Sequence, residues 1–130
     1  MLRERGLSAA LTSLAERASL PVEIIDHYRQ RAPDTIEACL YFSAAEAITN
    51  ALKYSAATHL TIELTAANGL LELRVSDDGR GGATIEPGGG LAGLQDRVAA
   101  LGGSLDLESA PDVGTRITIV LPLPGDGDAR

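Results

Sequence analysis

Three polar side chains on one predicted helix have the types and the spacing to hold a phosphate group and its metal ion. Glu46 and Asn50 are four residues apart and Lys53 follows three residues later, so all three lie on one helix face. A carboxylate there could orient water, an amide oxygen could bind Mg²⁺, and an ammonium group could neutralise a phosphate. The alternative is an ordinary solvated helix face. Asn50 fits that alternative poorly, because asparagine is a weak helix former and lies beside an apolar stripe here.

Two glycine-rich loops follow this helix in the sequence. Seven of the fourteen glycines lie between residues 79 and 93. The first loop, residues 77–82, carries two carboxylates directly after a predicted strand, and the second, residues 88–90, runs into a predicted helix. Glycine lets the backbone approach a ligand closely, and the free N–H groups of a helix N-terminus attract phosphate. The pattern indicates a phosphate-binding site, although not a P-loop, since GxxxxGK[ST] is absent.

The elements that must position these residues include three helices. Apolar residues recur at helical spacing over residues 6–17 and over residues 91–101, and a glycine pair after the latter is typical of a C-cap. The central helix begins at Asp34, and Glu37 three residues later predicts a capping box. One apolar stripe follows this helix for about five turns: Ile36, Leu40, Ala44, Ala47, Ile48, Ala51 and Leu52.

Strand periodicity dominates the rest of the chain. Residues 60–65 and 71–76 alternate apolar and polar side chains around the Asn-Gly pair at 68–69, which predicts a β-hairpin. Residues 22–25 form a short apolar run, and alternation over 105–121 predicts two more strands, the last of which closes the sheet. One face of these strands must be covered. The sequence therefore predicts an α/β (α+β) two-layer sandwich, with helices on one face of a mainly antiparallel mixed sheet.

Composition limits the domain organisation and the possible partners. The length suits a single domain, predicted over residues 1–124, with a flexible tail at 125–130. A formal net charge of −7, a pI near 4.7 and 3% aromatic residues argue against nucleic-acid binding. Cys39 is the only cysteine, no apolar run has the length of a membrane span, and residues 1–5 lack the apolar core of a signal peptide. We therefore expect a cytoplasmic domain without direct membrane contact, whether or not a longer parent protein is membrane-anchored.

Four segments, in their order along the chain, carry a resemblance to a known family. They resemble the N box, the DxGxG box, the second glycine box and the final glycine-threonine box in the ATP-binding domain of sensor histidine kinases: EAITNALKYS at 46–55, DDGRG at 77–81, GGGLAGLQDRV at 88–98 and Gly114-Thr115. Residues 91–103 are most similar to the NarL/DesK-type subgroup. The resemblance spans residues 4–122 and implies the Bergerat ATP-binding fold, which gyrase-type ATPases and heat-shock-90 chaperones share.

The resemblance implies a role for each matching residue. Asp77 would accept the amino N–H of adenine, while Gly79 and Gly81 would let the backbone lie against the base. Asn50 would hold Mg²⁺ through its side-chain oxygen, and Lys53 would add positive charge near the phosphates.

The remaining motif residues divide between the phosphates and the adenine pocket. Backbone N–H groups at the helix start would cradle the phosphates, and the final box would reach the adenine pocket through a water; the residues concerned are Gly88, Gly90, Leu91, Gly114 and Thr115. Glu46 matches the residue that activates water in the ATPase relatives, so Glu46 and Asn50 are the candidate catalytic residues.

The chain departs from the family pattern at two positions and lacks one part of it. Tyr54 replaces a frequent histidine, Gly82 replaces a frequent bulky apolar residue, and the predicted ATP lid at 82–87 is short and mobile. Neither histidine, His27 or His59, lies in a long amphipathic helix of the phosphoacceptor type, so both are expected at strand ends or on the surface. The resemblance therefore implies a catalytic domain that needs ATP and Mg²⁺, a separate dimerisation and phosphoacceptor domain and, through that domain, a response regulator.

Two other functions remain open on the sequence alone. A free-standing anti-sigma-factor serine kinase has the same fold at a similar length, and a nucleotide-sensing module would bind ATP without transferring phosphate. The short lid and residues 101–122 favour the histidine kinase, and intact Asn50, Lys53 and Asp77 favour an active transferase.

Overall fold

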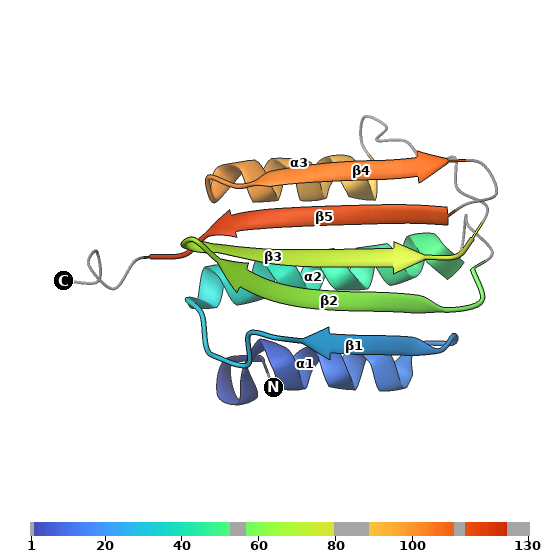
Figure 1. Cartoon of the computed structure of the whole chain (residues 1–130), viewed down its shortest axis with the longest axis horizontal. Helices are drawn as coiled ribbons and strands as arrows, with labels where there is room; N and C mark the ends of the chain where they lie inside the picture. The colour runs from blue at the N-terminus through green and yellow to red at the C-terminus, as the bar shows by residue number, and fades with distance from the viewer. Residues whose placement is uncertain (1, 53–56, 80–88, 111–113, 125–130) are drawn as a thin grey trace.

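The computed structural model describes residues 2–52, 57–79, 89–110 and 114–124. Its elements, in chain order, are α1 (Leu2–Arg17), β1 (Val22–Asp26), α2 (Asp34–Asn50), β2 (Leu60–Ala67), β3 (Leu70–Asp77), α3 (Gly90–Ala100), β4 (Ser104–Ala110) and β5 (Gly114–Pro122). The strands form a five-stranded sheet in the order β1-β2-β3-β5-β4. The helices of the described residues cover one face of it, with α1 behind β1, α2 behind the centre and α3 behind β4 (Figure 1).

The sheet is mixed but mainly antiparallel, as predicted. β1 pairs with β2 in parallel, because α2 carries the chain back across the sheet between them. Every other neighbouring pair is antiparallel. The β2–β3 hairpin turns at Asn68 and Gly69, whose φ angles of 55° and 77° are both positive, as a two-residue type I′ turn requires.

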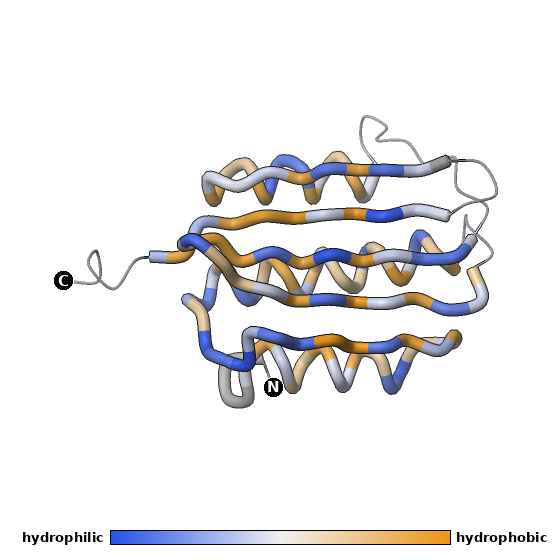
Figure 2. The backbone as a smooth tube through the Cα atoms, viewed as in Figure 1, coloured by the Kyte–Doolittle hydropathy of each residue, from blue (hydrophilic) through white to orange (hydrophobic). Residues whose placement is uncertain are grey.

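The alternating pattern of the strands produces a single apolar layer under the helices. Hydropathy alternates along β2, β3 and β5 in Figure 2, and the apolar members of each alternation are buried. On the helix side, α2 contributes the apolar stripe that the sequence predicts, except that Leu52 lies beyond the end of the helix and is exposed. The most deeply buried large apolar side chains, all less than 2% exposed, are Leu7, Leu11, Leu40, Leu60, Ile62, Leu64, Leu71, Leu73, Val98, Ile119 and Leu121.

The sequence expectation that the last strand closes the sheet is wrong. β5 lies between β3 and β4, and β4 forms the edge. The burial of the two strands agrees with this order: Ile117, Ile119 and Leu121 of β5 are almost completely buried, whereas Leu105 and Leu107 of β4 are only half-buried. The strand with the more apolar helix-facing side therefore takes the interior position.

The predicted capping box at the start of α2 is also wrong. Pro33 is the N-cap residue of α2, no side chain caps the helix, and Asp34 is its first residue. Glu37 reaches back past Pro33, which has no N–H to offer, and accepts a hydrogen bond of 2.9 Å from the Ala32 N–H. The completely buried Glu37 carboxylate also accepts bonds from Arg31 at 3.1 and 3.3 Å, so it ties the preceding loop to α2.

We expect Glu37→Ala to lower the free energy of unfolding by about 2–3 kcal/mol, because it removes three hydrogen bonds to a buried carboxylate and leaves the Ala32 N–H without that acceptor. Denaturant unfolding measures the loss. Glu23→Ala, on the exposed side of β1, is the matched control and should change stability by less than about 0.5 kcal/mol. Equal effects of the two substitutions would show that the buried carboxylate contributes no more to the free energy of unfolding than an exposed one.

The glycine pair after α3 acts as the C-cap that the sequence predicts. The N–H of Gly102 bonds to the Ala99 carbonyl at 3.0 Å, and the N–H of Gly103 bonds to the Val98 carbonyl at 3.0 Å. These two bonds form a Schellman motif, with Gly102 in the left-handed conformation at φ 79°. The motif ends α3 and turns the chain into β4.

Two predictions concern the chain as a whole: the absence of a membrane span and the boundary of the domain. No helix within the described residues is both long enough and apolar enough to cross a membrane. The single-domain boundary at residue 124 stays a prediction, and the predicted tail, residues 125–130, lies outside the described residues.

Candidate functional site

The sequence motifs come together at one end of the two-layer sandwich. At this end β3 finishes at Asp77, β2 and β5 start, α2 finishes and α3 starts (Figure 1). The strand register fixes the arrangement, because Asp77 pairs with Leu60 on β2 and with Thr115 on β5. Motifs that are up to about 70 residues apart in the sequence therefore meet at one place.

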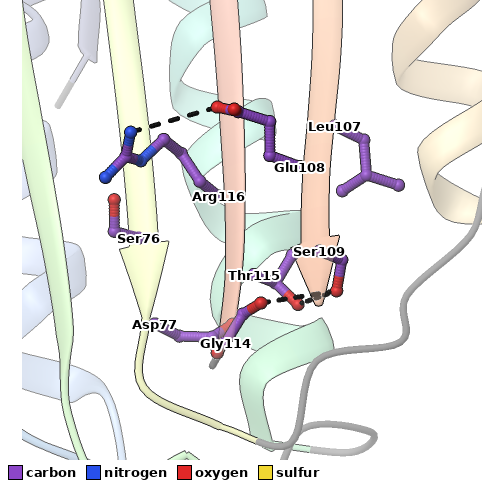
Figure 3. Close-up of a pocket in the computed structure, with 8 residues that line it drawn as sticks. All are labelled: Ser76, Asp77, Leu107, Glu108, Ser109, Gly114, Thr115 and Arg116. Atoms are coloured by element: carbon purple, nitrogen blue, oxygen red, sulfur yellow. Dashed lines mark hydrogen bonds and ion pairs between the residues drawn. The ribbon is translucent and has the colours of Figure 1, made fainter. Parts of the chain in front are cut away.

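A pocket with a volume of about 560 Å³ opens at this end of the sheet. Its lining comes from the ends of β3 and β4 and the start of β5: Ser76, Asp77, Leu107, Glu108, Ser109, Gly114, Thr115 and Arg116 (Figure 3). Asp77, Thr115 and Ser109 form a row across the three strands, since Asp77 pairs with Thr115 and Thr115 with Ser109. This row therefore presents one carboxylate and two hydroxyl groups on neighbouring strands.

Asp77 is held in place by the loop that follows it. Its Oδ1 accepts a hydrogen bond of 2.8 Å from the N–H of Gly79, and the residue is half-buried. Asp77 continues the helix-facing set of β3, after Leu73 and Val75. The carboxylate thus has a fixed direction, and its oxygens can accept a hydrogen bond from a ligand N–H in the pocket.

Gly114 stands at a position that only glycine can fill. Its φ angle is +121°, and a Cβ atom built there would overlap the backbone carbonyl oxygen of Asp77. Glycine lets the first residue of β5 lie directly against the end of β3. The Gly-Thr pair therefore places Thr115 beside Asp77, which agrees with the predicted association of these residues.

Thr115 is almost completely buried, and its hydroxyl lies 2.9 Å from the hydroxyl of Ser109 (Figure 3). Ser109 was not among the residues predicted for the site. A signal was present, because Ser109 breaks the apolar alternation of β4 after Leu105 and Leu107 on the helix-facing side. A polar residue at such a position is typical of a strand end that lines a site.

The structure brings Glu46 of α2 against the start of α3. A Cβ atom on Gly90 would collide with the Glu46 carboxylate, so the second glycine box gives this side chain its space. Gly89 is the N-cap residue and has no side chain that could satisfy the first N–H groups of α3. A helix start of this kind carries partial positive charge and favours an anion, whether the Glu46 carboxylate or a phosphate.

Asn50 lies one helical turn after Glu46, at the last position of α2, and is half-buried. Its amide nitrogen Nδ2 is buried and has no hydrogen-bond partner within the described part of the chain. A buried amide without a partner costs free energy unless a ligand or water satisfies it. The amide therefore marks a position where a bound group is expected.

Several predicted site residues lie outside the described residues. They are Lys53, Gly81 and Gly88, together with the two departures from the family pattern, Tyr54 and Gly82. Of the other predicted residues, Gly79 and Leu91 are buried at the first glycine loop and at the start of α3. The histidines are at strand ends, as expected: His27 follows β1 and His59 precedes β2, and both are exposed.

Asp78 does not point at the pocket row, although it is the second acid of the motif. Its Oδ1 accepts hydrogen bonds from the N–H groups of Thr58 at 2.8 Å and His59 at 3.1 Å. Its Oδ2 accepts the Thr58 hydroxyl and lies 3.1 Å from His59 Nδ1. These hydrogen bonds, led by that of the Thr58 hydroxyl, hold the pKa of Asp78 well below its ordinary range.

Comparison with known proteins gives one family and a set of sensor proteins. The family model described as "Histidine kinase-, DNA gyrase B-, and HSP90-like ATPase" matches residues 36–125. The chain is 30% identical to Sensor protein VraS of Staphylococcus saprophyticus over 94% of this chain and 37% of that protein. It is also 30% identical to Sensor protein VraS of Staphylococcus haemolyticus over 98% of this chain and 38% of that protein.

A likeness to a solved structure supports the fold. The histidine kinase domain of the Erythrobacter litoralis EL346 blue-light activated histidine kinase matches with a TM-score of 0.71 at 23% identity. That match covers 90% of this chain and 57% of the other. The chain spans less than two fifths of the length of the two VraS relatives.

Proposed function

The chain belongs to the family of histidine kinase-, DNA gyrase B- and HSP90-like ATPases, and we propose that it transfers the γ-phosphoryl group of ATP to a histidine. It is an ATP-binding catalytic domain of the sensor histidine kinase type. The acceptor histidine belongs to a separate dimerisation domain of the parent kinase, from which a response regulator takes the phosphoryl group. One observation carries the proposed site: Asp77, fixed by Gly79, lies beside Thr115 in the open pocket.

The row formed by Asp77, Thr115 and Ser109 recognises adenine in the proposed function. The Asp77 carboxylate accepts the 6-amino N–H of adenine, and guanine is rejected because it presents a carbonyl oxygen at that edge. Gly79, which is buried and donates to Asp77, gives the base a backbone surface without a side chain. Gly81, which lies outside the described residues, is proposed to serve in the same way. The Thr115 hydroxyl, beside Ser109, contacts the base through a water molecule.

The phosphates lie between α2 and the start of α3. Backbone N–H groups of Gly88, Gly90 and Leu91 bind the phosphate oxygens, and Lys53 adds a positive charge. This placement is supported by the start of α3, where no side chain makes a capping hydrogen bond, and by the closeness of Gly90 to Glu46 of α2.

The residues at the end of α2 fit a magnesium ion that is shared with the nucleotide. Among the residues that the structure describes, no group of three His, Cys, Asp or Glu side chains could hold a metal ion alone. Mg²⁺ commonly takes one or two protein oxygens and completes its shell with phosphates and water. The side-chain oxygen of Asn50 would supply one such ligand, and its amide nitrogen, which has no hydrogen-bond partner within the described residues, could donate to a phosphate oxygen. When bound, the ion neutralises phosphate charge in the transition state.

In the proposed function, Glu46 orients the group that attacks the phosphate. Its carboxylate lies at the start of α3, one helical turn before Asn50. An acceptor histidine that docks at this point can donate its N–H to the carboxylate, which turns the other ring nitrogen towards the γ-phosphate. Transfer by this route depends mainly on positioning and charge neutralisation.

We expect the chain to bind ATP and yet not to label itself. His27 follows the end of β1 that lies away from Asp77, and His59 is tied to Asp78 at 3.1 Å, so neither can reach the phosphate site without unfolding a strand end. The measurement is incubation with γ-labelled ATP and Mg²⁺, alone and with a helical-hairpin phosphoacceptor domain.

The control for this experiment is a hairpin whose acceptor histidine is replaced by glutamine. Label should appear on the intact hairpin and be absent from both the chain and the control hairpin. Stoichiometric, acid-labile label on the chain itself would contradict the proposal. Label on a serine, stable to acid, would indicate the serine kinase instead.

A further inference from the structure

Asp78 joins two segments of the chain that both carry site motifs. One segment is the end of β3 with Asp77, and the other is residues 57–59, which follow the end of α2 and lead into β2. Two backbone N–H groups and one hydroxyl donate to the Asp78 carboxylate, and the ring of His59 lies at its edge. The Asp78 carboxylate therefore accepts three hydrogen bonds from residues 58 and 59, which directly precede β2.

The position of Asp78 in the hairpin explains what these bonds do. Leu60 and Asp77 form the last paired residues of β2 and β3, and the regular ladder stops there. The side chain of Asp78 then continues the pairing by one step, because it accepts the N–H groups of Thr58 and His59. The end of β3 is therefore attached to β2 beyond the last backbone pair.

Asp77 is constrained on its other sides by glycines. Gly114 of β5 lies directly against its backbone carbonyl, and Gly79 donates to its Oδ1. The Asp78 clamp, which we define as Asp78 with Thr58 and His59, provides the constraint from the β2 side. The direction of the Asp77 carboxylate is thus determined from both neighbouring strands and from the following loop.

We propose that Asp78 is a positioning residue for adenine recognition, which acts by fixing Asp77 through the attachment of β3 to residues 58 and 59. This proposal rests on the proposed function, in which Asp77 accepts the amino group of adenine. It assigns different roles to the two adjacent acids: Asp77 contacts the base, and Asp78 fixes the backbone that aims Asp77.

The test compares ATP with inosine triphosphate, which has a carbonyl oxygen in place of the 6-amino group. Binding of both nucleotides is measured by calorimetry. The ratio of ATP affinity to inosine triphosphate affinity reports whether the Asp77 carboxylate is oriented towards the 6-amino group. We expect Asp78→Ala to lower this ratio by about tenfold, through a loss of ATP affinity, while inosine triphosphate binds almost as before. A simple loss of folded protein would lower both affinities equally and leave the ratio unchanged.

Conservative variants separate positioning from charge. Asp78→Asn keeps Oδ1, which accepts both N–H groups, so this variant should retain most of the preference for ATP over inosine triphosphate. Thr58→Val combined with His59→Ala removes the side-chain contacts and keeps both N–H groups, so the ratio should fall by about threefold. Asp106→Ala, at an exposed position on β4, is the matched acidic control and should change neither affinity.

The outcomes distinguish this inference from the proposed function. If Asp77→Asn leaves the ratio unchanged, the proposed role of Asp77 has failed. If Asp77→Asn abolishes the preference for ATP over inosine triphosphate but Asp78→Ala does not, the proposed positioning role of Asp78 is wrong. Should Asp78→Ala not fold, an unchanged ratio in the Thr58→Val, His59→Ala variant would overturn the inference equally.

Discussion

Asp77→Asn should weaken ATP binding by about tenfold or more, with little change in folding. Oδ1 is held by the N–H of Gly79, so an asparagine keeps its oxygen on that side and turns its NH₂ group towards the base. Two donors then face each other where adenine presents its amino group. Such an unmatched polar pair costs about 1–3 kcal/mol, and about 1.4 kcal/mol corresponds to a tenfold change in affinity. Calorimetric titration with ATP measures the loss.

The control for this variant is Asp106→Asn, which makes the same chemical change at an exposed position on β4 and should leave ATP affinity unchanged. Thermal unfolding of both variants shows whether the pocket end of β3 is intact. A folded Asp77→Asn variant with unchanged ATP affinity would remove Asp77 from the adenine site. Asp78 could not simply take its place, because its carboxylate is already occupied by residues 58 and 59.

Much of the fold follows from local sequence signals. The Asn-Gly turn at 68–69, the period-2 alternation on either side of it and the apolar stripe of α2 each specify one element and one buried face. These signals agree with one another, so the two-layer architecture could be predicted before the structure was known. The position of β5 inside the sheet could not, because strand order depends on the relative burial of distant strands.

The described part of the candidate site could be predicted in its residue types, but the residues that support it could not. Asp77, Gly114 and Thr115 meet as the motifs indicate, because strand register brings them together. The cap at α2 differs from the expected capping box because a proline N-cap offers no N–H, a fact that a pattern of side chains three apart does not include.

The hidden supports share one physical feature. Ser109 pairs with Thr115, and Asp78 binds the N–H groups of residues 58 and 59, so each depends on a partner in another segment of the chain. Sequence spacing can place two residues on one helix face or one strand face. It cannot show which side chain meets a backbone N–H that lies about 20 residues away in the chain.

Asn50→Ala should reduce phosphoryl transfer to a phosphoacceptor hairpin by on the order of 100-fold, while ATP affinity falls by less than about tenfold. The adenine pocket around Asp77 lies on the sheet and keeps its contacts, whereas the end of α2 loses the oxygen proposed to hold Mg²⁺. The variant also removes a buried amide nitrogen that has no partner within the described residues, so its folding stability should not fall. Transfer rate and unfolding free energy are measured on the same preparation.

A second readout separates a lost metal ligand from a general defect of α2. In the unchanged chain, Mg²⁺ should strengthen ATP binding, and in Asn50→Ala this dependence should largely disappear, since nucleotide affinity becomes similar with Mg²⁺ and with a chelator. Thr49→Ala, at the exposed neighbouring position of α2, is the matched control and should keep both transfer and the Mg²⁺ dependence. Asn50→Asp retains an oxygen but adds negative charge beside the phosphates, so it should bind Mg²⁺ and still transfer slowly. If Asn50→Ala keeps both transfer and Mg²⁺ dependence, Asn50 is part of a solvated helix face, and the metal must be held by the nucleotide and by residues other than Asn50.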